Sequence, residues 1–393
     1  NVLLFDEGNG PLFQYYDATF CKIPDETEYP YRALLINKFP PPSKGGIWRS
    51  KDGLKWELVP NQHKLDVPFE ANKPTYDPFK NRYLAYLRLW DPPAKPVTSW
   101  RKVILSESII TKKGIDWTEK ELVFEANEAD GPTTDVYNMQ VTAYAGVYVG
   151  FPEMFHRKGF KPELRGTLYN ELAFSQDGRN WQRISQGQAF LPVGSPGNWD
   201  HGMARIMSNP VIINNQLYFY FQGIRGLHIH PRKPGWGQRA CGLATLRLDG
   251  FCSLDAGHEG GTLITVPFWP KGKHLFINAD AREGEIRVEV LQEYTAHGNK
   301  ETGLFSLENC IPFSGDALAH RVEWKHGKNF IDDFPDGWNV DLQNIDEGKT
   351  RNFSKRAIEL KIYIRDAKLY SIWFADEPMP YEVGRLIPLC LTD

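Results

Sequence analysis

The sequence lacks the features that mark membrane-spanning proteins, disulfide-rich domains and zinc sites. No apolar run among its 393 residues approaches the ~20 residues that a membrane-spanning helix needs. Its five cysteines are scattered and include no Cys-x-x-Cys pair, which argues against a dense disulfide framework and a cysteine-based zinc site. We therefore expect no membrane partner, no metal site and no cofactor.

Clusters of positive charge and long amphipathic helices are also missing. The net charge is −3 and no Lys/Arg-rich run occurs, so nothing favours a nucleic acid as partner. No long stretch repeats apolar residues with a period of 3.6. Instead, 34 glycines, 28 prolines and an aromatic content of 13% favour many short strands joined by tight turns. A neutral or polar small molecule is the expected partner.

A short phrase recurs along the first two thirds of the chain. It occupies residues 50–56, 113–117 and 175–181, and a weaker echo follows at 246–251. Its tryptophans, Trp56, Trp117 and Trp181, lie 61 and 64 residues apart. A fixed period of this size indicates a repeated structural unit, and the same place in each unit indicates that these tryptophans pack the fold rather than bind a ligand.

Each copy predicts a β-hairpin, because an Asp-Gly or Gly-Ile-Asp turn separates an apolar run from a tryptophan-bearing one. Further strand-like runs accompany the hairpins, at residues 82–90, 146–151 and 216–221. Four strands in about 60 residues are typical of a β-propeller blade with long loops. Four blades can be counted. A fifth would combine residues 1–20 with the segment near 255–270, or would begin before residue 1.

The pattern changes near residue 270. Apolar and charged residues alternate with a period of two at residues 274–278, 285–291, 320–324, 358–365 and 369–374. This alternation predicts a β-sandwich without blade repeats. We place the boundary inside 255–275 and divide the chain into a propeller at 1–268 and a sandwich at 269–393.

The repeated Ser-x-Asp-Gly-x-x-Trp hairpin followed by a jelly-roll-like sandwich resembles the five-bladed β-propeller glycoside hydrolases of families 32, 43 and 68. Phrases at residues 242–251, 254–257 and 276–281 resemble related bacterial proteins. The Asn-Asp-Pro-Asn, Arg-Asp-Pro and Glu-Cys motifs of family 32 are missing, which argues against a fructan-cleaving enzyme. The resemblance implies an all-β fold, a carbohydrate substrate and, by analogy, a periplasmic or extracellular location.

Glycoside hydrolysis needs two carboxyl groups, one acid and one base or nucleophile. The inner strands of a propeller would bring one carboxylate per blade to a central funnel. We expect Asp17, Asp135 and Asp200 to be these catalytic groups, because each is a polar interruption where a blade opens. Asp135 could instead cap a turn with Thr133 or Thr134. Asp77 follows ordinary turn chemistry and is left out of the site.

Other polar residues near the same strand ends are candidates for binding the substrate. Glu153 and Glu171 are also alternatives for the acid, unless Glu153 pairs with Arg157 or Arg165 and Glu171 is a solvated strand position. The imidazole of His201 would point away from Asp200 on a strand, and Arg225 with His228 could line the funnel rim. The full set is Tyr137, Asn138, Glu153, His156, Glu171, His201, Arg225 and His228.

Two other functions fit the same scaffold. A polysaccharide lyase would use a His or Tyr base and an arginine that neutralises a uronate. Its residues would be Tyr137, His156, His201, His228 and Arg225. A non-catalytic carbohydrate-binding propeller would keep its aromatic residues and lack a carboxylate pair.

Overall fold

The computed structural model of the chain is all-β, as predicted. It describes residues 5–6, 10–11, 15–23, 26–37, 43–68, 73–91, 100–111, 114–159, 165–228, 238–268, 272–292, 300–301, 305–327 and 358–376. Contacts divide the chain into two compact units, and the division falls between Thr245 and Leu246. Among the described residues, no helix is long and apolar enough to cross a membrane. The number of propeller blades and the sandwich topology stay predictions.

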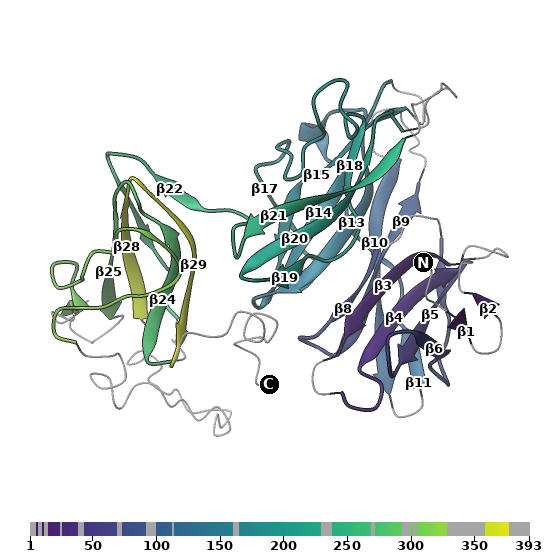
Figure 1. The fold of residues 1–393 in the computed structure, drawn as a ribbon, viewed down its shortest axis with the longest axis horizontal. Helices are drawn as coiled ribbons and strands as arrows, with labels where there is room; N and C mark the ends of the chain where they lie inside the picture. Colours follow the sequence, from purple (N-terminus) through teal and green to yellow (C-terminus); the bar gives the residue numbers. More distant parts are fainter. Residues whose placement is uncertain are drawn as a thin grey trace, which may run out of the picture. The chain divides into compact units, whose positions relative to one another are not determined.

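The first two sheets of the N-terminal unit come from consecutive stretches of chain (Figure 1). The first sheet runs in the order β2-β1-β6-β5-β4-β3, with β7 beside β5, and the second runs β11-β10-β9-β8, with β12 beside β10. The strands of the first are β1 (Phe5–Asp6), β2 (Gly10–Pro11), β3 (Tyr15–Lys22), β4 (Tyr31–Asn37), β5 (Ser43–Ser50), β6 (Lys55–Leu58) and β7 (Leu65–Val67). Those of the second are β8 (Lys73–Asp77), β9 (Arg82–Trp90), β10 (Arg101–Thr111), β11 (Gly114–Trp117) and β12 (Glu121–Phe124).

The third sheet follows a short 3-10 helix, η1 (Glu128–Asp130), and runs in the order β17-β16-β14-β15-β18-β20-β19. Strand β13 pairs with β14, and β21 pairs with β20. The strands are β13 (Thr134–Tyr144), β14 (Val147–Arg157), β15 (Gly166–Asn170), β16 (Leu172–Ser175), β17 (Gln182–Ile184), β18 (Met203–Ile206), β19 (Val211–Ile213), β20 (Gln216–Ile224) and β21 (Arg239–Arg247).

Strand β9 explains how these sheets pack. Its sequence is almost wholly apolar, and successive side chains of a strand point to opposite faces. Tyr83, Ala85 and Leu87 therefore join a core cluster with the first sheet, whereas Leu84 and Tyr86 join another with β13 and β14. The second sheet is thus covered on both faces. Face-to-face stacking of consecutive sheets is the packing that the propeller prediction requires.

Two of the three predicted hairpin turns have the same hydrogen bonds. In each, the serine hydroxyl accepts the glycine N–H at 2.9 or 2.8 Å, and the aspartate accepts the N–H groups of the next two non-glycine residues at 2.8 Å. The indole N–H donates to the glycine carbonyl. The residues are Ser50, Asp52, Gly53 and Trp56 in one turn and Ser175, Asp177, Gly178 and Trp181 in the other.

The other two copies differ. The indole of Trp117 donates to the carbonyl of His63 rather than to its own turn. The echo at 246–251 forms no blade hairpin, because Asp249 accepts hydrogen bonds from Asn278 and Ser371 in the second unit. The repeated sequence phrase therefore forms the same turn in only two of its copies, at residues 50–56 and 175–181.

The C-terminal unit has two four-stranded sheets, ordered β22-β29-β24-β27 and β23-β28-β25-β26, whose apolar faces share one core cluster. The strands are β22 (Leu254–Ala256), β23 (Gly261–Ile264), β24 (His274–Asp280), β25 (Glu285–Gln292), β26 (Lys300–Glu301), β27 (Asp316–Arg321), β28 (Ile358–Arg365) and β29 (Ala367–Ala375). The unit begins before the expected boundary because β22 pairs with β29 and β23 with β28. Residues 254–264 therefore do not supply a fifth blade.

Candidate active site

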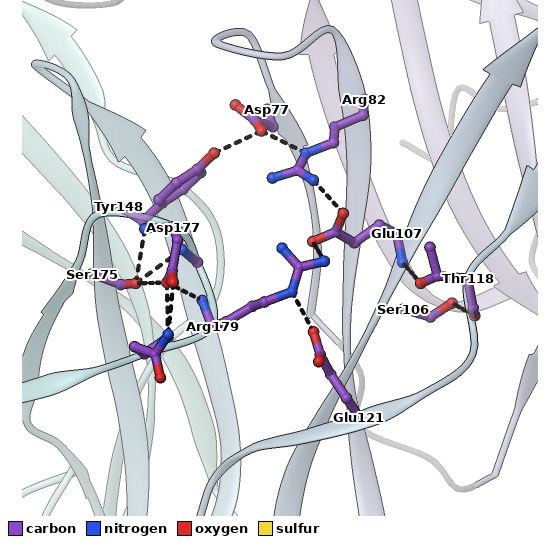
Figure 2. Close-up of polar contacts among 12 residues, drawn as sticks. Asp77, Arg82, Ser106, Glu107, Thr118, Glu121, Tyr148, Ser175, Asp177 and Arg179 are labelled. Carbon is purple, nitrogen blue, oxygen red and sulfur yellow. Dashed lines mark hydrogen bonds and ion pairs between the residues drawn. The ribbon is translucent and has the colours of Figure 1, made fainter.

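A buried ionic network joins the second and third sheets (Figure 2). Arg82 donates to Asp77 at 2.9 Å and to Glu107, and Glu107 also lies 2.6 Å from Arg179. The Tyr148 hydroxyl donates to Asp77 at 2.7 Å. Asp77 is fully buried, and it also accepts the backbone N–H of Phe79 at 2.9 Å, in agreement with the predicted turn. Because each charge of this set has an opposite partner, we assign the network to packing.

A second set of buried and half-buried polar side chains surrounds Tyr137 on β13. The guanidinium carbons of Arg88, Arg101 and Arg205 lie 4.5, 5.5 and 5.1 Å from the centroid of the Tyr137 ring. They come from the end of β9, the start of β10 and β18. The Tyr137 cluster comprises Arg88, Arg101, Asp135, Tyr137, Glu153, Phe155, Arg205 and His228.

Asp135 lies at the centre of an ion-pair group. Its side chain is fully buried on β13. One carboxylate oxygen accepts the backbone N–H of Trp100 at 2.7 Å, and the other lies 2.5 Å from Arg101 and 3.4 Å from Arg157. Asp135 therefore does not cap a turn with Thr133 or Thr134. A carboxylate that pairs with two arginines is suited to holding their guanidinium groups in place.

Glu153 on β14 has only one of its oxygens paired. Its Oε2 accepts two hydrogen bonds from Arg205, at 2.8 and 3.1 Å, and not from Arg157 or Arg165. The side chain is fully buried, and Oε1 accepts no hydrogen bond from any side chain or backbone group that the structure describes. A buried acceptor without a donor is rare in folded proteins.

A β-bulge places Tyr137 in this cluster. Val136 pairs with Met154 and Asn138 with Glu153, so Tyr137 is the extra residue between them. Bulges re-aim side chains and are frequent beside active sites. The Tyr137 hydroxyl lies 3.0 Å from Nε2 of His228, which also packs edge-on against Phe155. The amide of Asn138 is fully buried and accepts the N–H of Met139.

Strand β3 repeats this bulge. Tyr15 pairs with Asn37 and Asp17 with Ile36, which leaves Tyr16 as the extra residue. Asp17 therefore takes the register position in β3 that Asn138 takes in β13. Strand β8 contacts both β3 and β13. The backbone thus supports Asp17 as a candidate, and its side chain lies outside the described atoms.

His156 and Glu171 belong to a neighbouring group around Arg183. Glu171 is fully buried between β15 and β16, where burial raises the pKa of its carboxyl despite Arg183, so it is not a solvated strand position. Burial lowers the pKa of His156, whose Nδ1 lies 3.2 Å from the Thr134 hydroxyl. Because that hydroxyl already donates to the Asp130 carbonyl, Nδ1 must be the donor to it.

The remaining candidates precede or follow strands. Asp200 and His201 lie in the turn before β18, which begins only at Met203, and Asp200 lies against Gly194. Arg225 is exposed directly after β20. The structure therefore brings Asp135, Tyr137, Glu153 and His228 into one cluster, with Asn138 beside it. It does not place Arg225 there.

Sequence reasoning missed the three arginines around Tyr137. Arg88 interrupts the apolar run 82–90, and Arg205 follows two apolar residues in β18. The rule that identified Asp135, a charge within an apolar strand, would have found both. Among the described residues, no group of three His, Cys, Asp or Glu side chains could hold a metal ion.

Comparisons with known proteins give distant structural similarities only. No protein-family profile and no curated protein matches the chain. A glycosyl hydrolase from Bacteroides ovatus is similar over 61% of this chain and 68% of its own, with 12% identity and a TM-score of 0.38. The beta-1,2-mannobiose phosphorylase of Listeria innocua is similar over 53% and 51%, with 18% identity and a TM-score of 0.35.

A third structure comes from work on the GH130 family of mannoside phosphorylases and the glycoside hydrolases within it. It is similar over 60% of this chain and 68% of its own, with 12% identity and a TM-score of 0.39. The family of this structure, GH130, differs from families 32, 43 and 68 of the predicted resemblance. With TM-scores below 0.5, none of these similarities assigns an activity to this chain.

Proposed function

We propose that the N-terminal unit is a glycoside hydrolase whose active site is the Tyr137 cluster. One observation carries the proposal. Two fully buried carboxylates, Asp135 and Glu153, lie on the adjacent strands β13 and β14, with the Tyr137 ring of β13 and with arginines from β18 of the same sheet and from the second sheet. Charged groups held in place inside a fold are expensive to bury and are typical of functional sites.

The two carboxylates have different tasks in this proposal. Asp135 orients Arg101 and Arg157 and does not itself react. Glu153 faces the substrate. The second reacting carboxyl group comes from Asp17, because its register position on β3 matches that of Asn138 on β13, and Asp200 is the other candidate for this role.

A screen of neutral and acidic oligosaccharides with the full chain tests the proposal. We expect one new reducing end per cleaved bond, without added phosphate. Asp135→Asn should reduce kcat/KM by about 10²-fold, because misplaced arginines spoil the geometry of the site. Asp77→Asn is the matched control, since Asp77 is equally buried and arginine-paired but lies outside the cluster. Its kcat/KM should stay within a few-fold of wild type.

The outcome that contradicts hydrolysis is specific. Equal activity of Asp135→Asn and Asp77→Asn, with both variants folded by circular dichroism, removes the cluster from the mechanism. Binding of oligosaccharides without turnover identifies a binding module. Turnover that requires inorganic phosphate identifies a phosphorylase.

A lyase is the second candidate, because of the contact between Tyr137 and His228. Their 3.0 Å hydrogen bond beside arginines offers a phenolic or imidazole base and a cation for a uronate. Elimination leaves a carbon–carbon double bond in the product. A rise in ultraviolet absorbance during turnover of an acidic glycan would therefore favour the lyase, and hydrolysis leaves the absorbance unchanged.

A further inference from the structure

We propose that Glu153 is the catalytic base of the site and that its Oε1 is the reacting atom. This inference rests on the proposed hydrolase function and adds the role of one carboxylate to it. The first step is the protonation state. Oε2 lies 2.8 Å from a guanidinium nitrogen of Arg205, and a guanidinium pairs with a carboxylate rather than with a carboxylic acid. Glu153 is therefore suited to accept a proton and unsuited to donate one.

The second step concerns Oε1, the carboxylate oxygen of Glu153 that has no hydrogen-bond donor in the described part of the chain. Oε1 is buried and receives no hydrogen bond from the described residues, so a buried anionic oxygen lacks a donor. Such an oxygen is costly unless something fills the position. The hydroxyl of a sugar, or a water molecule about to react, is a donor of the required kind. Oε1 has a polar neighbour, because Arg205, which pairs with the same carboxylate, also contacts the Tyr137 ring.

The third step is a comparison with other buried glutamates. Glu107 in the ionic network of Figure 2 has an arginine nitrogen within ion-pair distance of each oxygen; its Oε1 accepts no hydrogen bond from the described residues either, but it lies 2.6 Å from Arg179. Glu171 has Arg183 on one oxygen and the N–H of Gly187 on the other. Both have the pairing expected of structural carboxylates. Glu153 is equally buried and also pairs with an arginine, but only one of its two carboxylate oxygens has a partner among the described residues.

The reaction can be written with this geometry. Oε1 takes a proton from a water molecule while the water oxygen forms a bond to the anomeric carbon. The bond between that carbon and the glycosidic oxygen breaks, and the leaving oxygen takes a proton from the second carboxyl group. The substrate gains one water molecule, and the anomeric configuration inverts. Arg205 is a positioning residue, because it holds the carboxylate and touches no reacting atom.

Variants of the full chain test this role. Glu153→Gln keeps the shape and removes the base, so kcat should fall by about 10²–10⁴-fold while KM changes little. Glu107→Gln is the matched control and should leave kcat within a few-fold of wild type. In Glu153→Ala, sodium azide should restore part of the turnover and yield a glycosyl azide, because the small anion attacks without a base. The first product of the wild type should have inverted configuration by NMR.

The outcomes separate this inference from the function on which it rests. A wild-type chain that cleaves no glycan overturns the hydrolase proposal and the role of Glu153 together. An active wild type with a folded and equally active Glu153→Gln variant overturns the role of Glu153 alone. Retention of the anomeric configuration also overturns the base role, since Glu153 would then act as a nucleophile.

Discussion

At the scale of single residues, the buried polar groups of β13 and β14 differ in how many polar partners they have. Asp135 accepts hydrogen bonds from Trp100 and Arg101 and forms a second ion pair with Arg157, whereas Glu153 has one oxygen paired and His156 has one nitrogen paired. Nε2 of His156 is buried and has no hydrogen-bond partner among the described residues. The Thr134 hydroxyl has a single proton, which goes to the Asp130 carbonyl at 2.6 Å. The imidazole is therefore held in one tautomer.

Thr134→Val should release this tautomer. In the wild type we expect the proton on Nδ1 of His156 and a bare Nε2, because the threonine oxygen can only accept. In the variant both tautomers should be populated, and the free energy of unfolding should fall by about 1 kcal/mol for the lost hydrogen bonds. Nitrogen-15 NMR of the imidazole measures the first, and urea unfolding the second. A wild-type ring protonated on Nε2 would contradict the assignment.

Part of this residue chemistry is visible in the sequence. Asp135, Tyr137 and Asn138 interrupt an apolar strand, and the structure places Asp135 and Tyr137 in one cluster with Glu153. The contact of Glu153 with Arg205 could not be predicted, because 52 residues separate the partners and only the pairing of distant strands brings them together. The orphaned Oε1 has no sequence signal, since it depends on which donors the fold leaves out.

At the scale of elements, the turns and β-bulges are the places where particular residues are required. Glycine is required in the Ser-x-Asp-Gly turns, where Gly53 and Gly178 have φ of 76° and 78°. Burial alone would raise the pKa of Asp177, but the N–H groups of Asn180 and Arg179 lower it. The bulges at Tyr16 and Tyr137 were not predicted, because one inserted residue does not disturb the apolar pattern enough to be read.

Asp177→Ala should lower the free energy of unfolding by about 1 kcal/mol at pH 7, as the loss of a capping aspartate does. Folding lowers the pKa of Asp177. Its contribution to the free energy of unfolding is therefore fully present above the pKa of the unfolded chain, near 3.9, and is lost as pH falls through the pKa of the folded state. Urea unfolding at pH 7 and pH 3 measures both. Asp116→Ala is the control, because exposed Asp116 accepts only the N–H of Trp117 from the backbone. Equal losses in both variants would contradict this account.

At the scale of the whole molecule, the chain consists of two all-β units with separate cores. The order of these units and the strands 82–90 and 358–365 could be predicted, since strong apolar patterns fix them. The boundary could not be predicted, because residues 254–264 pair with strands about a hundred residues later and such pairing has no local sequence signal. We propose that carbohydrate binds to the N-terminal unit, which carries the Tyr137 cluster.

The most direct test of this claim is a crystal structure of the full-length Glu153→Gln variant with an oligosaccharide. We expect a sugar ring against Tyr137 and a sugar hydroxyl, or a water molecule at the anomeric carbon, about 3 Å from the side chain at position 153. A glycan bound only to the C-terminal unit, or at a place in the N-terminal unit remote from Tyr137 and Arg205, would contradict the account.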